Sequence, residues 1–223
     1  MKITKILNHE QLKIINPLIQ ELKFQDGRQS ADGLAKEVKK NSEAKSDTGE
    51  YKKLTKYLAE IIYRNEWIKQ RFFPSKFSPP LINKYTKDQG YGLHFDNSHM
   101  QSKYVGAVRK DFSYTLMLSS IDNYEGGELE IISNNNLKQT VKLDSGDMVI
   151  YPSTTLHSVL PIKNGKRIAY VGWFSSYIKN LEANNILNEL EDFQIDLENY
   201  SLPNDLLLKI SAFKNKLIHF FSE

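Results

Sequence analysis

Two kinds of hydrophobic spacing divide the chain into three consecutive parts. Near both ends, apolar residues recur every three or four positions, which is typical of helices with one buried face. Between residues 81 and 175, short alternating runs are separated by breaks rich in glycine, asparagine and aspartate, which is typical of strands joined by tight turns. The pattern therefore predicts helices at both ends and a β-rich centre.

The N-terminal part starts with alternation over residues 2–7, which predicts a short strand. Asn8 is a favourable helix cap, and the apolar spacing after it predicts a helix to about Phe24. Pro17 lies inside this helix and should kink or split it, because proline has no N–H to donate. Residues 25–50 are polar and favour a solvated loop, with a mobile flap over an active site as the alternative.

Eight candidate strands follow a second predicted helix over residues 50–70. They are Leu81–Thr86, Gly92–Phe95, Phe112–Ser119, Glu128–Ser133, Gln139–Leu143, Met148–Tyr151, His157–Pro161 and Arg167–Ser175. Short strands with tight turns and no helices between them are typical of a double-sheet jelly roll. Helical spacing resumes over residues 178–192 and 202–222, on either side of a break at Pro203.

The expected fold class is therefore α+β, with a double-stranded β-helix (jelly roll) as its core. N-terminal helices pack on this core, and the chain ends in a C-terminal helical extension. We expect the N-terminal portion to span residues 1–75, the jelly roll 76–176 and the extension 177–223. The chain has 223 residues, of which 40% are hydrophobic, and this is enough for one large domain with extensions.

Composition narrows the chemistry. The absence of cysteine excludes disulfides and thiolate metal sites, and it is compatible with a reducing cytoplasm. A net charge of +3 is too small to indicate a nucleic-acid partner. No apolar run approaches the ~20 residues of a membrane-spanning helix, and residues 1–8 are too polar for a signal peptide. We expect a cytoplasmic protein with neither nucleic-acid nor membrane partners.

The candidate metal ligands are His94, Asp96 and His157. Residues two apart on an extended segment point to the same side, so His94 and Asp96 can aim at one point. His157 comes several strands later, as a jelly roll requires if early and late strands are to meet. Two histidines and one carboxylate are the ligand set of non-haem Fe(II) oxygenases. Arg167 starts the strand after His157, and its guanidinium could clamp the far carboxylate of a dicarboxylic co-substrate.

Other histidines offer few rivals to this set, because the chain has five in all. His9 and His219 lie in the predicted terminal helices and are expected to be structural or exposed. His99 is the competitor of Asp96 as a ligand, or a neighbour of the ligands. Gly126 and Gly127 are interpreted as a tight turn before a strand and not as a phosphate cradle, since no helix follows them.

A family resemblance rests on motifs spread through nearly the whole chain. They are Phe24-Gln25-Asp26-Gly27-Arg28, Val38-Lys39-Lys40-Asn41, Asn83-Lys84-Tyr85, Tyr91-Gly92-Leu93-His94-Phe95-Asp96, Arg109-Lys110-Asp111-Phe112-Ser113, Tyr124-Glu125-Gly126-Gly127-Glu128-Leu129, Gly146-Asp147 and Tyr151-Pro152-Ser153, with His157 and Arg167. The chain resembles the PKHD-type hydroxylases, a bacterial branch of the Fe(II)/2-oxoglutarate dioxygenases related to prolyl 4-hydroxylases. It departs from them in the segment between Asp96 and Arg109, and in Lys40, where an asparagine is expected.

The resemblance implies a dioxygenase that consumes O2 and 2-oxoglutarate and releases succinate and CO2. It implies His94, Asp96 and His157 as catalytic iron ligands and Arg167 as the 2-oxoglutarate anchor, with ascorbate as a candidate further cofactor. Tyr85 is either a hydroxyl donor to 2-oxoglutarate or a core aromatic residue. Such chemistry calls for a closing loop, for which residues 97–111 and 28–50 are the candidates.

The substrate is left open between a peptidyl proline, a free small molecule and a nucleobase, and proline is suggested by kinship alone. Trp173 and Phe174 follow Arg167, and we expect one of them to pack the sheet while either could wall the pocket. Exposed apolar faces on the last two helices would permit a homodimer. The alternative to an enzyme is a non-catalytic jelly-roll module that keeps a metal or ligand pocket for sensing or scaffolding.

Overall fold

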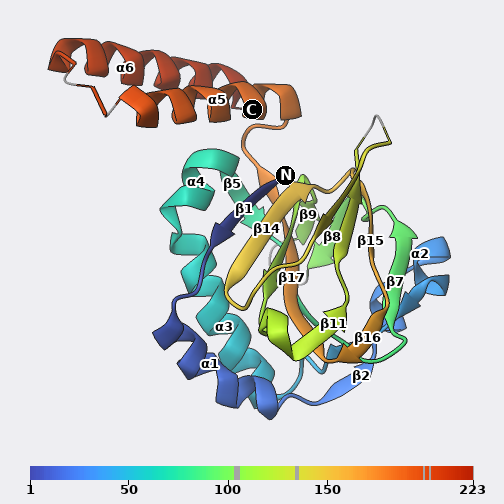
Figure 1. Cartoon of the computed structure of the whole chain (residues 1–223). Coiled ribbons are helices and arrows are strands. Elements are labelled where there is room, and N and C mark those ends of the chain that lie inside the picture. Colours follow the sequence, from blue (N-terminus) through green and yellow to red (C-terminus); the bar gives the residue numbers. More distant parts are fainter. Residues whose placement is uncertain (103–105, 134–135, 198, 201, 223) are drawn as a thin grey trace.

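Two β-sheets face each other, and helices cover the outer face of the larger one (Figure 1). The computed structural model describes residues 1–102, 106–133, 136–197, 199–200 and 202–222. The larger sheet runs in the order β1 (Lys2–Lys5), β14 (Asp147–Pro152), β10 (Phe112–Met117), β17 (Arg167–Ser176), β6 (Leu81–Tyr85), β4 (Ser42–Ala44) and β2 (Phe24–Asp26), and β5 (Pro74–Phe77) also pairs with β17.

The smaller sheet runs in the order β13 (Lys138–Val141), β12 (Leu129–Ile132), β15 (Leu156–Val159), β7 (Gly90–His94) and β3 (Lys39–Lys40). Two further pairs are β11 (Tyr124–Gly126) with β16 (Ile162–Gly165), and β8 (His99–Ser102) with β9 (Gly106–Arg109). Neighbouring strands in both sheets are antiparallel. This is the jelly-roll core that the strand pattern predicts, and all eight expected strands are present in it.

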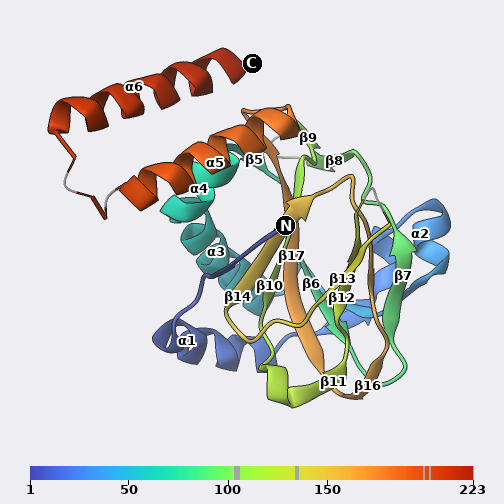
Figure 2. The same ribbon diagram turned by 45° about the horizontal axis from the view of Figure 1, so that its top comes forward.

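The helices are α1 (His9–Gln20), α2 (Gly33–Glu37), α3 (Gly49–Arg64), α4 (Glu66–Phe72), α5 (Leu181–Leu197) and α6 (Asn204–Phe221), with short 3-10 turns at Gly27–Ser30 and Ile121–Asn123. Helices α1, α3 and α4 lie along the outer face of the larger sheet (Figure 2). No described helix is both long enough and apolar enough to span a membrane.

Alternation along the strands separates the two cores. On β14, Met148 and Ile150 pack with the helices, whereas Val149 and Tyr151 face the smaller sheet. The other strands at the centre of the larger sheet follow the same rule, because side chains of a strand alternate between its faces. Odd-numbered positions of β6, β10, β14 and β17 therefore build the interior between the sheets, and this is where the chemistry lies.

The helix ends follow their capping residues. Asn8 accepts a hydrogen bond from the Gln11 amide, and the Gln11 side chain accepts one from the Asn8 amide, which closes a capping box. Helix α1 continues unbroken past Pro17, so the expected split does not occur. The single helix expected over residues 50–70 is two helices, because Asn65 ends α3 and caps α4.

The expectation of a solvated loop over residues 25–50 is wrong. This segment contains β2, the first 3-10 turn, α2, β3 and β4, and it adds two strands to the larger sheet and one to the smaller. Lys39, Asn41 and Glu43 are buried in it. The polar composition predicts a loop because strands of two or three residues are too short to show a period of alternation. The charged side chains are buried only because they are partners of each other.

Helices α5 and α6 form a hairpin that stands away from the sheets in Figure 1. Helix α5 is joined to α4, where the side-chain amides of Asn184 and Asn188 donate to the Arg71 carbonyl and Arg71 pairs with Asp192. Helix α6 packs on α5, and none of its described residues is buried. These helices match the expected ones, with the first running five residues further than its expected end at residue 192.

Candidate metal centre

Strand pairing brings the three predicted ligands together. Strands β7 and β15 are antiparallel neighbours, and His94 and His157 are direct cross-strand partners. Asp96 follows two residues after His94, just beyond the end of β7. Directly opposed residues on one face of an antiparallel pair have neighbouring side chains. The two imidazole rings accordingly lie 4.2 Å apart between centroids.

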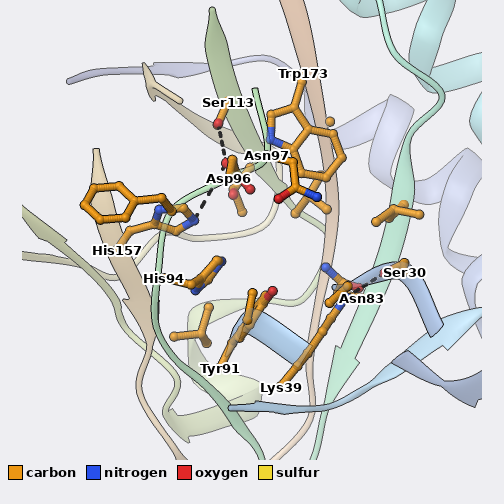
Figure 3. A pocket seen from close by; sticks show the side chains of 18 of the residues that line it. Ser30, Lys39, Asn83, Tyr91, His94, Asp96, Asn97, Ser113, His157 and Trp173 are labelled. Atoms are coloured by element: carbon orange, nitrogen blue, oxygen red, sulfur yellow. Dashed lines mark hydrogen bonds and ion pairs between the residues drawn. The ribbon is translucent and has the colours of Figure 1, made fainter. Parts of the chain in front are cut away.

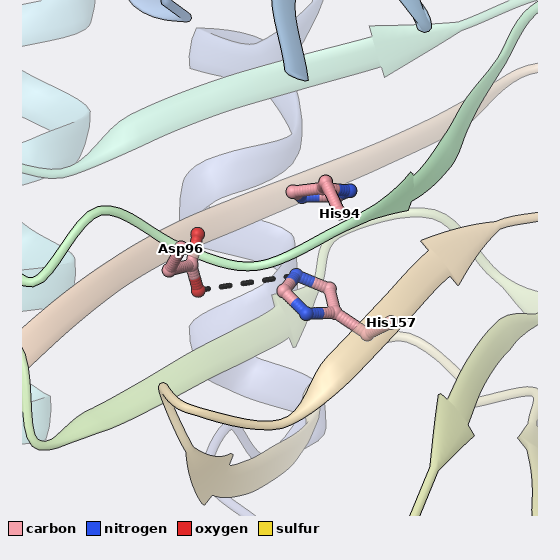
Figure 4. Close-up of side chains that lie close together, drawn as sticks. All are labelled: His94, Asp96 and His157. Atoms are coloured by element: carbon pink, nitrogen blue, oxygen red, sulfur yellow. Dashed lines mark ion pairs between the residues drawn. The ribbon is translucent and has the colours of Figure 1, made fainter. Parts of the chain in front are cut away.

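One ligand atom from each of His94, Asp96 and His157 lies within 4.8 Å of the other two, and these residues could hold a metal ion. Figure 4 shows the carboxylate of Asp96 facing the ring of His157, with His94 above them. The distance from His157 Nε2 to Asp96 Oδ2 is 3.9 Å. His99 lies outside this group: it starts β8, is exposed, and its Nδ1 is hydrogen-bonded to Ser98 Oγ.

Backbone carbonyls orient both imidazoles. His94 Nδ1 lies 2.8 Å from the Gly92 carbonyl oxygen, and His157 Nδ1 lies 2.9 Å from that of Thr155. A carbonyl only accepts, so both Nδ1 atoms carry the proton and both Nε2 atoms present lone pairs. Burial, and then the neighbouring His157, lowers the pKa of His94 to about 4, which keeps its imidazole neutral at neutral pH.

A serine pair supports the carboxylate. Ser113 Oγ donates to Asp96 Oδ2 at 2.6 Å and also lies 2.8 Å from Ser153 Oγ. A hydroxyl carries one proton, so Ser153 donates in the second bond and makes Ser113 a better donor in the first. Neither serine can be selected for this role from local patterns, because the contact depends on how β10 and β14 pair.

Arg167 is buried at the interior end of β17, where its backbone register pairs it with Tyr85 on β6. Its guanidinium carbon lies 5.3 Å from the centroid of the Tyr85 ring. Its Nε has no hydrogen-bond partner, and no described carboxylate forms an ion pair with it. A buried, unpaired charge is costly, so the site is built to receive an anion.

A cavity of about 800 Å³ opens to solvent and connects these groups. Arg167 and Tyr85 line it together with the three candidate ligands. Figure 3 shows His94, Asp96 and His157 in this cavity wall. Tyr91 stacks on His94 with 3.6 Å between ring centroids. Burial raises the pKa of Tyr85 to about 12, so its hydroxyl keeps its proton. Tyr85 also belongs to the interior hydrophobic cluster, so both interpretations of this residue agree with its position.

Of the two aromatic residues after Arg167, Trp173 forms part of the pocket wall and Phe174 packs the sheet. Trp173 lines the cavity, whereas Phe174 is fully buried in the cluster beneath the helices. Gly126 and Gly127 both adopt positive φ, at 78° and 69°, and confirm the predicted turn. Both loops proposed as lids supply cavity residues, for example Ser30 from one and Met100 from the other. Residues 103–105 lie outside the described part of the second loop, and closure stays a prediction.

Two buried lysines are cavity residues that the sequence did not reveal. Lys39 pairs with Glu43 at 2.5 Å, and its Nζ donates to Ser30 Oγ at 2.7 Å. Lys110 lies over the ring of Trp173 at 3.8 Å. Both lysines occur in charged stretches, which usually lie on the solvated surface. For Lys110, its position just before the strand that starts at Phe112 was the one local indication that it could be buried.

The fold and the donor set define a class of protein. Residues 80–175 match the family profile of the 2OG-Fe(II) oxygenase superfamily. Two imidazoles and one carboxylate suit iron(II) and leave coordination positions open, so the residues present fit the metal. Arg167, which has no carboxylate partner among the described residues and an unpartnered Nε, fits a dicarboxylic co-substrate.

Relatives that match nearly the full length narrow this class. A PKHD-type hydroxylase of Hyphomonas neptunium is 36% identical over 99% of this chain and 98% of its own length. A second, of Acinetobacter baumannii, is 32% identical over 99% of this chain and 98% of its own length. The chain belongs to the PKHD-type hydroxylases and is a 2-oxoglutarate- and iron(II)-dependent oxygenase.

Solved structures agree on the fold. A Trichoplax adhaerens prolyl hydroxylase, in complex with a hypoxia inducible factor oxygen degradation domain peptide fragment, has a TM-score of 0.55 and 18% identity, covering 78% of this chain and 82% of that one. HygX of Streptomyces hygroscopicus, with nickel, 2-oxoglutarate and hygromycin B bound, has a TM-score of 0.54 and 13% identity over the same shares. At such identities the likeness concerns the jelly-roll fold.

Proposed function

We propose that His94, Asp96 and His157 hold the iron of this hydroxylase, and that Arg167 anchors the distal carboxylate of 2-oxoglutarate. The observation that carries the assignment is the convergence of three ligand atoms within 4.8 Å beside a buried guanidinium whose Nε is unpartnered and that has no carboxylate partner among the described residues. Iron bound here would supply the O2 chemistry that hydroxylates a C–H bond and converts 2-oxoglutarate to succinate and CO2.

The groups around the cavity orient the candidate ligands and bind the co-substrate. The carbonyls of Gly92 and Thr155 keep both Nε2 atoms free of protons, and Ser113 fixes the Asp96 carboxylate. Arg167 neutralises the distal carboxylate of the co-substrate through charge-assisted hydrogen bonds. The protonated Tyr85 hydroxyl serves as a further donor to the same molecule. The aromatic walls, among them Tyr91, exclude water from the reacting groups.

The substrate proposed is a peptidyl or small-molecule group with an accessible C–H bond. A peptide-bound neighbour supports the first of these, and an aminoglycoside-bound neighbour supports the second, each at the level of the fold. The absence of cysteine fits the reducing cytoplasm that we propose as its location. The division into residues 1–75, 76–176 and 177–223 is kept as part of this proposal.

A homodimer formed through α6 completes the proposal. Leu206, Phe213 and Phe220 follow one another at intervals of seven residues, so they lie on one face of the helix. Their exposed fractions are 41%, 57% and 76%. Leu217 and Phe221 lie beside this stripe and pack on the cluster that joins α6 to α5. The exposed apolar stripe that remains supports a second copy as its cover.

Calorimetric titration of 2-oxoglutarate into the full chain, with Mn(II) in place of iron, tests the residue assignment. Wild-type protein should bind in a metal-dependent manner. His94→Ala should lose this dependence, and Arg167→Met should weaken binding by roughly 100-fold, because it removes the charge that faces a buried carboxylate. Succinate formed with Fe(II) and O2 should fall to background in both variants.

Arg28→Met is the matched control, since Arg28 is exposed and pairs only with the neighbouring Asp26 among the described residues. This variant should bind 2-oxoglutarate as the wild type does. Metal-independent binding, or wild-type succinate formation no faster than that of His94→Ala, would contradict the assignment. No 2-oxoglutarate binding at all would instead favour a jelly-roll module without catalysis.

A further inference from the structure

Lys110 is a buried cation inside the cavity without a carboxylate partner. It precedes β10, and its side chain is only 9% exposed. Its Nζ lies 3.8 Å from the centroid of the Trp173 ring, and it forms no ion pair with any carboxylate in the described residues. The cation–π contact offsets part of the cost of burying the charge but does not neutralise it.

Trp173 offers a second unused group at the same place. It faces the interior from β17, and its Nε1 is buried with no hydrogen-bond acceptor among the described residues. Figure 3 shows the indole nitrogen on the side of the ring that faces Asp96 and Asn97. A buried indole N–H almost always has a partner, and leaving it unpaired costs about 1–3 kcal/mol. An acceptor bound in the cavity would supply that partner.

The buried charges of the cavity leave one cation over, since Asp32, which also lines the cavity, is exposed to solvent. Lys39 is already neutralised by Glu43. With iron(II) and 2-oxoglutarate bound, the two positive charges of the metal and that of Arg167 equal the negative charges of Asp96 and of the two co-substrate carboxylates. Lys110 then remains as the one cation in the described cavity wall without a counter-ion. A buried cation of this kind favours an anionic ligand.

We propose that the substrate of this hydroxylase carries a carboxylate, which Lys110 and the Trp173 N–H bind beside the iron site. The proposal rests on the proposed function, because the co-substrate must occupy Arg167 for the balance to hold. Lys110 and Trp173 border the cavity with Asp96, so a bound carboxylate would place the neighbouring part of the substrate near the metal ligands. Lys110 is thus a specificity-determining residue.

Tryptophan fluorescence offers a direct test, because the chain contains only two tryptophans. In a Trp67→Phe background, Trp173 is the sole reporter. The full chain is loaded with Mn(II) and saturating 2-oxoglutarate, whose binding is first confirmed by calorimetry. Acetate, benzoate and N-acetylglycine are then titrated beside acetamide, benzamide and N-acetylglycinamide. We expect each carboxylate to quench saturably, with a Kd about tenfold below that of its amide, because the amide lacks the charge that Lys110 pairs with.

Lys110→Met should abolish this preference while 2-oxoglutarate still binds. Lys40→Met is the matched control, since Lys40 is exposed on β3, and it should keep the preference. Equal affinities for acids and amides, or a preference that survives in Lys110→Met, would overturn the inference. Quenching that disappears once 2-oxoglutarate saturates would assign the probes to the co-substrate site and would overturn it as well. Absent 2-oxoglutarate binding in the wild type would instead reject the proposed function.

Discussion

Arg167 needs space as well as an anion, and Gly127 provides that space. A Cβ at Gly127 would lie 3.0 Å from Arg167 Cδ and 2.3 Å from Ile162 Cδ1. The residue also has a φ of 69°, a conformation that favours glycine. Gly127 therefore has two separate reasons to be glycine, one in its own backbone and one in the path of the guanidinium.

Two alanine substitutions separate these reasons. Gly106 has a similar φ of 71°, but apart from its chain neighbours no atom of the described residues lies within 4 Å of the position of its Cβ. Gly127→Ala and Gly106→Ala should each lose about 1–2 kcal/mol of unfolding free energy from backbone strain. Only Gly127→Ala should also weaken 2-oxoglutarate binding, by roughly tenfold, because the new methyl displaces Arg167. Urea unfolding and calorimetry measure the two effects.

Equal 2-oxoglutarate affinity in both alanine variants would show that the Arg167 side chain tolerates the crowding. Weakened binding in Gly106→Ala would show that backbone strain, and not the contact with Arg167, reaches the site. The pair is informative because the two glycines share a backbone conformation and differ in their surroundings.

At the scale of elements, strand register decides the site. Alternation in the sequence predicts that His94 and Asp96 share a face, and the jelly roll predicts that a late strand returns to them. The direct pairing of His157 with His94 depends on hydrogen bonds between β7 and β15, which no local pattern encodes. The convergence of the three candidate ligands was therefore predictable, whereas the role of Ser113 was not, because its contact with Asp96 crosses from one sheet to the end of β7.

The segment over residues 25–50 shows the other limit of prediction. Lys39 and Glu43 are four positions apart and polar, so the pattern indicates a solvated surface. In the fold, β3 joins one sheet and β4 the other, and the two side chains meet with exposed fractions of only 4% and 7%. Two charges are buried here because each is the counter-ion of the other, a property of the pair that single residues do not reveal.

The buried pair should be strongly coupled. Lys39→Met leaves Glu43 without its cation, and Glu43→Gln leaves Lys39 without its anion, so each should cost about 3–5 kcal/mol of unfolding free energy. The double variant should cost far less than the sum, because it leaves no uncompensated charge. Urea denaturation of the four proteins measures the coupling energy.

The exposed pair of Lys13 and Glu10 on α1 is the control for this cycle. Lys13 Nζ lies 2.9 Å from Glu10 Oε1, yet the side chain of Lys13 is 59% exposed and that of Glu10 is 74% exposed. The corresponding Lys13→Met and Glu10→Gln cycle should show a coupling below about 0.5 kcal/mol. Equal coupling in the two cycles would mean that water reaches the Lys39–Glu43 pair.

At the scale of the whole molecule, the two sheets and the N-terminal helices support one cavity, whereas the α5–α6 hairpin does not. The N-terminal helices stiffen the outer face of the large sheet, and the two sheets enclose the site. No described residue of the α5–α6 hairpin lines the cavity, and the hairpin is attached to α4. We therefore expect its exposed stripe to serve association between chains and not the chemistry of the site. Mutations should be able to change association without changing co-substrate binding.

Phe213→Glu tests this separation. Phe213 occupies the middle of the stripe on α6 and is 57% exposed, so a carboxylate there should not disturb the packing of one chain on itself. In the proposed dimer this substitution would place two charges in an apolar contact. Light scattering should then show a shift from the mass of a dimer to the mass of a monomer. Metal-dependent 2-oxoglutarate binding should be unchanged, because the stripe lies outside the cavity.

Asn215→Glu introduces the same charge at an exposed polar position of the same helix and should leave the dimer intact. A wild-type chain that is already a single mass at the same concentration would refute the dimer, and the hairpin would then expose its stripe to a different partner. A Phe213→Glu chain that became a single mass and also lost 2-oxoglutarate binding would show that association supports the site. The distinction matters because the fold positions every proposed ligand within one chain, and α6 contacts the rest of the chain through α5 and through Ile178, two residues beyond the end of β17.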